Sequence, residues 1–218
     1  MIFTLFLAFV SFPDKKDAIL QKNLNLVQVE SSGSLGYYYQ GKCHMTTPNM
    51  TLVPDEKIEW CSNIAKSKND TPWISYSLKN KQMKITGYSL RNGCCYYECC
   101  CCDNSGDIDG HFCCCDLYSF SLHGSNDNKT WEIIHSVKAV KDFYLCKFNT
   151  YEFSITKSYR YIKLVQDEPY PNCLHCMSIN QIEFYGEVVN SLFDYDVSDD
   201  DNDEPVSIIG KINRNEFE

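Results

Sequence analysis

Nine of the fourteen cysteines lie in one segment, CCYYECCCCDNSGDIDGHFCCC, between Cys94 and Cys115. Cysteine thiolates bind zinc and copper, and a histidine or a carboxylate can complete such a site. The segment has no clean pair of C-x-x-C motifs, and four consecutive cysteines cannot all face one tetrahedral ion. The candidate metal ligands are Cys99, Cys100, Cys102, His111, Cys113 and Cys115.

The same cysteines allow two other kinds of chemistry. In an oxidising compartment they would form disulfides, and near a membrane exposed thiols can be acylated. We favour disulfide bonding or plain packing within a locally cross-linked hairpin, with metal binding second. The stretch DNSGDIDG (103–110) alternates acids and glycines like a calcium loop but lacks the downstream glutamate of an EF-hand. No cofactor is therefore required by a motif, and zinc or calcium remains open.

Aromatic and apolar residues in two further segments could contact a ligand. Tyr37, Tyr38 and Tyr39 follow one another between two glycines, and a tyrosine offers a flat apolar face and a hydroxyl to a sugar ring. Asn49, Met50 and Leu52 form a second candidate group. The alternative is structural in both cases: the tyrosines pack as strand residues, and Met50 and Leu52 cover the end of the core.

Several classes of function are excluded by composition and motifs. The sequence has no nucleophile elbow, phosphate-binding glycine loop or HExxH motif, so we expect no enzyme. The net charge of −9 argues against nucleic acid as a partner, and no apolar run is long enough for a transmembrane helix. Ten acids and two bases lie in residues 187–218, so most of the negative charge belongs to the C-terminal segment.

The elements that must position these residues are short alternating strands. Runs with apolar residues at every second position are broken by turn residues, as in VQVESS, PWISYSL and LYSFSLHG, and helical periodicity is absent. In QMKITGYSL the alternation changes phase at Gly87, which is typical of a β-bulge. The pattern predicts an all-β protein, an antiparallel β-sandwich over residues 25–187, with the cysteine-rich insertion at 93–116. Trp131 is expected to be buried.

Several of these runs together resemble the discoidin family, also called the coagulation factor five/eight type C domain. The resemblance is carried, in order, by VQVESS, EWCSN, PWISYSL, ITGYSL, YSFSLHGSNDNKTWEII, SYRYIKLVQ and SINQIEFYG. It implies a jelly-roll, galactose-binding-like sandwich whose loops at one end bind carbohydrate or another cell-surface ligand without catalysis. The disulfide that clamps the domain ends in many secreted members has no counterpart here, which leaves an intracellular protein-interaction adaptor as the alternative.

The two ends of the sequence carry their own predictions. The apolar run at residues 1–12 is similar to a signal peptide. Residues 13–24 are expected to form a polar extension, and residues 188–218 are predicted to be a disordered acidic tail. We therefore expect a secreted or cell-surface protein, with the cytoplasm as the alternative. If the chain is secreted, Asn128 and Asn49 are the expected glycosylation sites.

Overall fold

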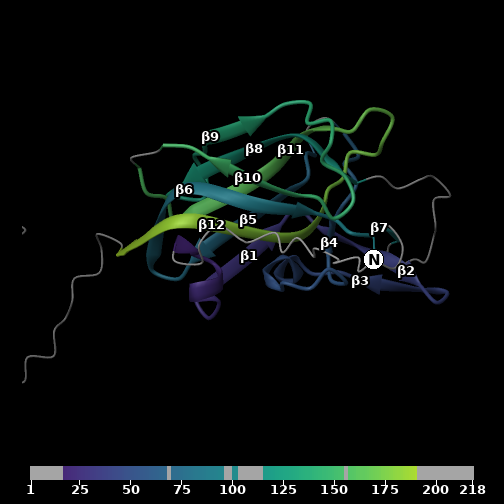
Figure 1. The fold of residues 1–218 in the computed structure, drawn as a ribbon, viewed down its shortest axis with the longest axis horizontal. Coiled ribbons are helices and arrows are strands. Elements are labelled where there is room, and N and C mark those ends of the chain that lie inside the picture. The colour runs from purple at the N-terminus through teal and green to yellow at the C-terminus, as the bar shows by residue number, and fades with distance from the viewer. Residues whose placement is uncertain (1–16, 68–69, 96–99, 103–114, 155–156, 191–218) are drawn as a thin grey trace, which may run out of the picture.

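Two antiparallel sheets pack face to face in the computed structural model, which describes residues 17–67, 70–95, 100–102, 115–154 and 157–190 (Figure 1). The five-stranded sheet has the order β1 (Val27–Ser31), β5 (Trp73–Leu78), β11 (Tyr161–Pro169), β8 (Leu117–Ser125) and β9 (Glu132–Val137). The seven-stranded sheet has the order β10 (Phe148–Glu152), β6 (Lys81–Asn92), β12 (Ser178–Asn190), β4 (Trp60–Ser62), β2 (Ser34–Tyr39) and β3 (Lys42–Met45), and β7 (Cys100–Cys102) pairs with β2. The predicted all-β sandwich is confirmed.

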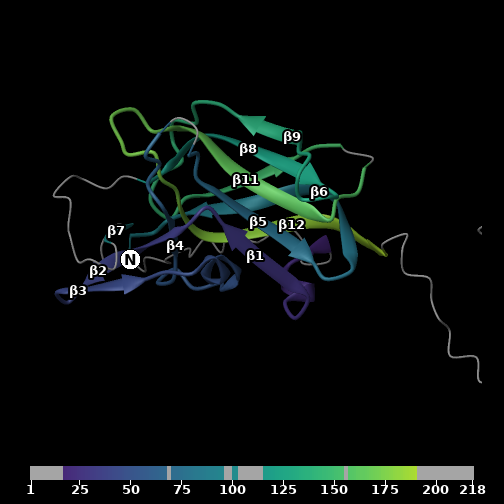
Figure 2. The same ribbon diagram turned by 180° about the vertical axis from the view of Figure 1, so that it is seen from behind.

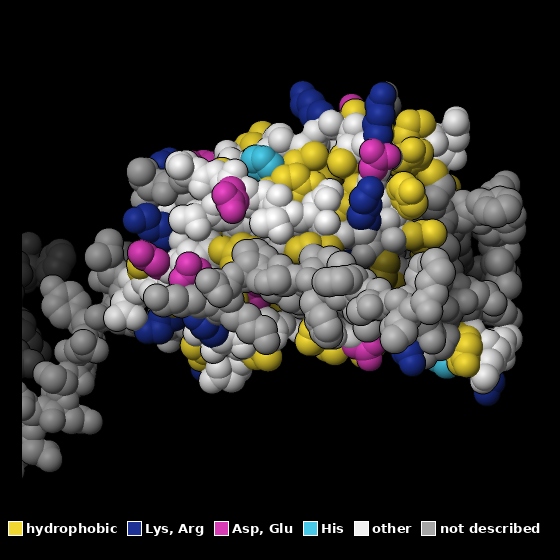
Figure 3. Space-filling model, in the orientation of Figure 1, with side chains coloured by type: hydrophobic (Ala, Val, Ile, Leu, Met, Phe, Trp, Pro, Cys, Tyr) yellow, Lys and Arg dark blue, Asp and Glu magenta, His cyan; other side chains and the backbone are white. Residues whose placement is uncertain are grey.

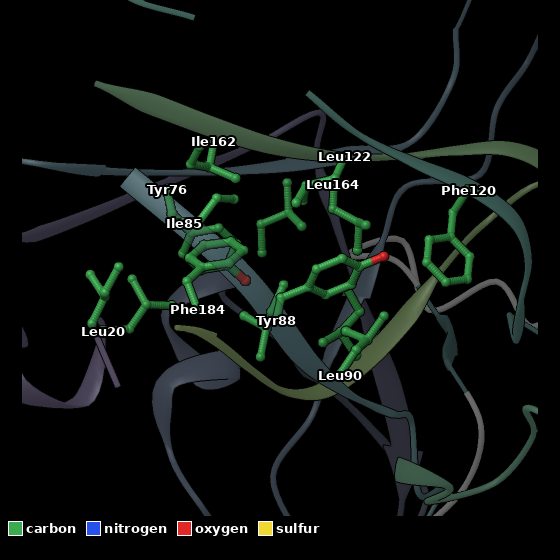
Figure 4. Packing of buried hydrophobic residues seen from close by; sticks show 14 of the residues in the cluster. Leu20, Tyr76, Ile85, Tyr88, Leu90, Phe120, Leu122, Ile162, Leu164 and Phe184 are labelled. Atoms are coloured by element: carbon green, nitrogen blue, oxygen red, sulfur yellow. The ribbon is translucent and has the colours of Figure 1, made fainter. Parts of the chain in front are cut away.

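The core lies between the sheets and is built from the alternating positions (Figure 4). Ile74, Tyr76 and Leu78 of β5 are at most 1% exposed, and Figure 4 shows Tyr76 beside Ile162 and Phe184. Tyr76 and Phe184 meet edge to face with ring centroids 5.5 Å apart. Period-two alternation thus places one face of each strand in the core, as the sequence predicts.

The change of phase in β6 is a β-bulge. Met83 and Ile85 are buried before Gly87, and Tyr88 and Leu90 are buried after it. Tyr185 of β12 pairs with Gly87 and Gly186 pairs with Ile85, so the register skips one residue of β6. A Cβ on Gly87 would lie 2.6 Å from the carbonyl oxygen of Tyr151, so the close approach of β10 requires glycine here.

The folded domain begins earlier than the predicted boundary at residue 25. Ile19 and Leu20 are at most 1% exposed, and the Ile19 backbone N–H donates to the carbonyl oxygen of Phe184 at 2.8 Å. The buried carboxylate of Glu183 accepts from the backbone N–H groups of Leu20 and Gln21. Two apolar residues are too few to show a periodic pattern. From the pattern alone, Ile19 and Leu20 therefore fall in the polar extension. The predicted signal peptide (1–12) and residues 191–218 of the predicted tail lie outside the described residues.

The tryptophan predicted to be buried is not the one in the core. Trp131 is only half-buried, whereas Trp60 is fully buried and its indole Nε1–H donates to the Ser34 hydroxyl at 2.8 Å. Trp131 stands just before β9, where it lies on the outer face of the sheet. In the described part of the chain, no helix has the length and apolar character needed to cross a bilayer.

Candidate functional site: an aromatic hairpin beside the cysteine-rich insertion

Both ends of the insertion are joined to the body of the sandwich by disulfides. Cys94 is bonded to Cys146, and Cys115 is bonded to Cys176, with sequence separations of 52 and 61. Backbone hydrogen bonds place each pair, because Cys146 N–H donates to the Gly93 carbonyl and Ser178 N–H donates to the Cys115 carbonyl. Cys43, Cys61 and Cys173 are disulfide-bonded as well.

These bridges bear on two predictions. The favoured disulfide bonding is confirmed for Cys94 and Cys115, and both described bridges run outside the insertion, to the β9–β10 and β11–β12 loops that lie against its two ends. Cys115 was a candidate metal ligand, but a sulfur in a disulfide is not a thiolate. Cys99, His111 and Cys113 lie outside the described residues, and for Cys100 and Cys102 only the backbone of β7 is described. Among the described residues, no group of three or more histidine, cysteine, aspartate or glutamate side chains is placed to hold a metal.

A buried carboxylate fixes the start of the insertion. Glu59 is 4% exposed, and its Oε2 accepts from the backbone N–H groups of Cys94 at 2.6 Å and Cys95 at 3.0 Å. Burial raises the pKa of Glu59. At the other end, Asp116 accepts from the side-chain amide of Asn92 at 2.5 Å, and burial raises its pKa too. The insertion therefore leaves the sandwich from fixed points.

The tyrosine segment is a β-hairpin, not a loop. β2 and β3 are paired along their length, with Gly36 opposite Met45 at one end and Tyr39 opposite Lys42 at the other. Gln40 and Gly41 join the strands, with φ values of 49° and 75°. Two residues with positive φ form the tight turn whose twist suits a hairpin. On its other side, β2 pairs with β7 of the insertion, at Gly36–Cys102 and Tyr37–Cys100. The tyrosine segment and the cysteine-rich insertion, two candidate sites in the sequence, are thus brought together (Figure 1).

Three aromatic rings form a row on this hairpin. The His44 imidazole stacks on Tyr37 with ring centroids 5.5 Å apart and an interplanar angle of 13°. Tyr39, two residues along β2 on the same face, has its ring centroid 6.1 Å from that of His44. His44 is exposed, and Tyr37 and Tyr39 are half-buried. Tyr38 is described only by its backbone, which pairs with Cys43. A row of rings with hydroxyl and imidazole edges can stack on the C–H face of a sugar and hydrogen-bond its hydroxyl groups.

The second predicted segment serves the core. It forms the 3₁₀-helix η3 (Pro48–Leu52), in which Met50 and Leu52 pack against the core and Thr51 is fully buried. The hydroxyl groups of Thr51 and Tyr76 lie 2.8 Å apart. Met50 and Leu52 therefore have the structural role that the sequence offered as the alternative, and Asn49 is exposed beside them.

Two large solvent-exposed residues near the insertion were not among the sites predicted from the sequence. Tyr144 and Leu145 are 53% and 54% exposed in the β9–β10 loop, next to the Cys94–Cys146 bridge, and the Lys147 ammonium lies 5.6 Å from the Tyr144 ring centroid. The sequence did contain a sign of this exposure, because Tyr144 and Leu145 are two large apolar residues in a segment without strand alternation. Figure 3 shows hydrophobic side chains gathered toward the right-hand side of the face it displays, with lysine, arginine and acidic side chains among them.

No protein-family model and no curated protein matches this sequence. Solved structures do match. A family 32 carbohydrate-binding module from a Clostridium perfringens family 89 glycoside hydrolase, in complex with GalNAc-β-1,3-galactose, has 14% identity and a TM-score of 0.50, covering 78% of this chain and 99% of that one. The family 32 module of C. perfringens NanJ, in complex with galactose, has 10% identity and a TM-score of 0.50, covering 78% and 98%.

A third structure gives the same result. Two family 32 modules of C. perfringens ZmpB, in complex with GalNAc, match with 12% identity and a TM-score of 0.53, covering 79% of this chain and 37% of that one. At these identities the likeness is one of fold. The chain has the galactose-binding-like β-sandwich that discoidin domains share with these modules, as the resemblance in the sequence predicts.

Proposed function

We propose that this protein is a non-catalytic carbohydrate-binding module, and that its ligand stacks on the rings of Tyr37, His44 and Tyr39. The observation that carries the proposal is the row of rings on a hairpin that projects from a galactose-binding-like sandwich. Sugar rings present flat C–H faces that aromatic side chains bind, and a neighbouring imidazole or phenol can bond the hydroxyl groups. Two of the matched modules are complexes with galactose and with GalNAc, which makes these two sugars the first probes.

The disulfides support a secreted or cell-surface location. The bridges Cys94–Cys146 and Cys115–Cys176 need an oxidising compartment to form and persist. They weigh against the intracellular adaptor, the alternative that the missing end clamp had suggested. We further propose that the chain is a divergent member of the discoidin group, on the ordered set of strands quoted above.

The test is a binding measurement with matched variants. Oxidised protein should bind immobilised galactose or GalNAc saturably, and Tyr37→Ala together with Tyr39→Ala should weaken binding by at least about tenfold, since both stacking faces are removed. The control is Tyr144→Ala, which removes an exposed tyrosine near the insertion but outside the hairpin. Equal loss in the control, or unchanged binding in the double variant, would move the site away from the hairpin.

A further inference from the structure

The outer face of the five-stranded sheet carries a lysine between two tryptophans. Lys163 of β11 points its ammonium at the ring of Trp131, 3.7 Å from the centroid, and lies 5.5 Å from the ring centroid of Trp73. β5, β11, β8 and β9 are on the side nearest the viewer in Figure 2, away from the core. Lys163 and both indoles are half-buried. The cation is thus held in place on a face that no described element covers.

The strand register aligns this lysine with its neighbours in one row across the sheet. Ile133, His123, Lys163, Ser75 and Glu30 follow one another on β9, β8, β11, β5 and β1. Tyr161, two residues before Lys163 on the same face of β11, adds a third ring, and the Arg160 guanidinium lies 5.6 Å from the Tyr161 ring centroid. Two cations and three aromatic rings therefore share one sheet face.

No carboxylate in the described part of the chain neutralises Lys163. Asp167, the acid nearest along β11, accepts from the Ser121 hydroxyl at 2.9 Å, and Glu168 accepts from Ser119 at 3.0 Å. Glu132 is paired with Lys157 at 2.6 Å. Glu30, the acid of the row, is two strands away from Lys163. Among the described residues, no carboxylate forms an ion pair with Lys163, so its charge is available to an anion.

The surroundings leave this positive charge partly desolvated. Burial lowers the pKa of Lys163, so part of its hydration is already lost before a ligand arrives. Burial and then the charge of Lys163 lower the pKa of His123, against the raising effect of the Asp167 carboxylate, which favours the neutral imidazole. Its Nε2 and the Ser121 hydroxyl lie 2.7 Å apart. An incoming anion therefore meets one fixed cation flanked by apolar ring faces, with the Asp167 carboxylate held away on the Ser121 hydroxyl.

We propose that this face is a second ligand site, which takes an acidic saccharide by placing its anionic group on Lys163 and its ring against Trp73 and Trp131. The anionic group is a carboxylate or a sulfate on a sugar ring, and the indoles select a ligand with flat apolar faces. The site is separate from the Tyr37–His44–Tyr39 hairpin and does not depend on it.

The experiment follows the indole N–H signals of the full chain by ¹⁵N NMR during titration. Galacturonate and galactose 6-sulfate are the two acidic probes, and galactose is the neutral one. Saturable shifts are expected for the Trp73 and Trp131 indoles, with Trp60, which is fully buried and bonded to Ser34, as the unshifted internal reference. The stronger of the two acidic probes identifies the anionic group. Shifts that are absent up to about 20 mM, or as large with galactose, would overturn the proposal.

Variants separate binding from packing. Lys163→Met keeps the aliphatic stem against the indoles and should weaken binding of the acidic probe at least about tenfold, because the charge-assisted hydrogen bond to the anion is lost. The matched control is Lys147→Met, which removes another lysine that lies over an aromatic ring. Trp131→Phe provides a second, milder change. Replacing the hairpin residues Tyr37 and Tyr39 by alanine should leave this titration unchanged. If Lys163→Met binds the acidic probe as well as the original protein does, the proposal is wrong.

Discussion

The sulfur of Cys94 is bonded to that of Cys146, which ties the start of the insertion to the loop before β10 across 52 positions of sequence. The Glu59 carboxylate accepts from the backbone N–H of the same Cys94. Covalent and hydrogen-bonded restraints therefore meet at one residue. These restraints fix the start of the insertion, whose strand β7 pairs with the tyrosine-bearing strand β2.

Removal of this bridge should destabilise the protein. Closing a loop of this length lowers the entropy of the unfolded chain by an amount worth about 4 kcal/mol at 25 °C. Replacing Cys94 and Cys146 together by alanine should lower the free energy of unfolding by about 2–4 kcal/mol, as measured by urea denaturation under oxidising conditions. An unchanged midpoint would show that the bridge does not form in solution.

The two tryptophans should differ in their cost of truncation. Trp60→Ala empties a fully buried site and should cost about 3–5 kcal/mol. Trp131→Ala removes a half-buried ring and its contact with Lys163, and should cost about 1–2 kcal/mol. Chemical denaturation measures both, and a reversed order would contradict the placement of the two rings.

The stability of the domain should fall as the pH rises above the ordinary range of glutamate. Burial raises the pKa of Glu183 above its usual 4.5, against the lowering effect of the backbone N–H groups of Leu20, Gln21 and Phe184. A raised pKa in the folded state means that its contribution to stability is fully present below pH 4.5 and is lost as the pH rises through the folded-state pKa. Glu183→Gln should therefore flatten the decline in the free energy of unfolding above pH 4.5.

Asp127 provides the control of opposite sign. The backbone N–H groups of Thr130 and Lys129 hold the pKa of this exposed carboxyl well below its usual range. Its stabilisation is present above its ordinary pKa of 3.8 and is lost as the pH falls through the lower folded-state value. Asp127→Asn should thus leave the profile above pH 4.5 with the slope of the original protein. A parallel flattening in both variants would rule out Glu183 as the cause.

Asn128 should be glycosylated when the chain is made in a eukaryotic secretory pathway. It is exposed, with φ of 58°, in the turn between β8 and β9, and Thr130 completes its sequon. Because β8 runs from the insertion toward this turn, a glycan here leaves the hairpin at the other end uncovered. Intact mass before and after peptide N-glycosidase, with Asn128→Gln as the control, is the measurement. An equal mass in both samples would exclude modification at this turn.

The sequence predicted the parts of the fold in which each strand has one buried face. β1, β5, β8 and the bulge in β6 follow from alternation at positions such as Ile74, Tyr76 and Leu78, because burial of one face imposes period two. Ile19 and Leu20 were missed because two apolar residues show no period. The partners of Cys94 and Cys115 could not be predicted, because they depend on which loops meet in three dimensions. His44 escaped notice because its stacking on Tyr37 depends on hairpin register.

The pairing of Cys94 with Cys146 has a consequence for a chain that has been cut. A single proteolytic cleavage anywhere between Cys95 and Cys115 yields two pieces, one holding Cys94 and the other Cys146. The bridge keeps these pieces in one covalent molecule, and the strands that pair across the cut, β6 with β12 and β5 with β11, keep their partners. A nicked protein would migrate as a single species on a gel until a reductant splits it into two.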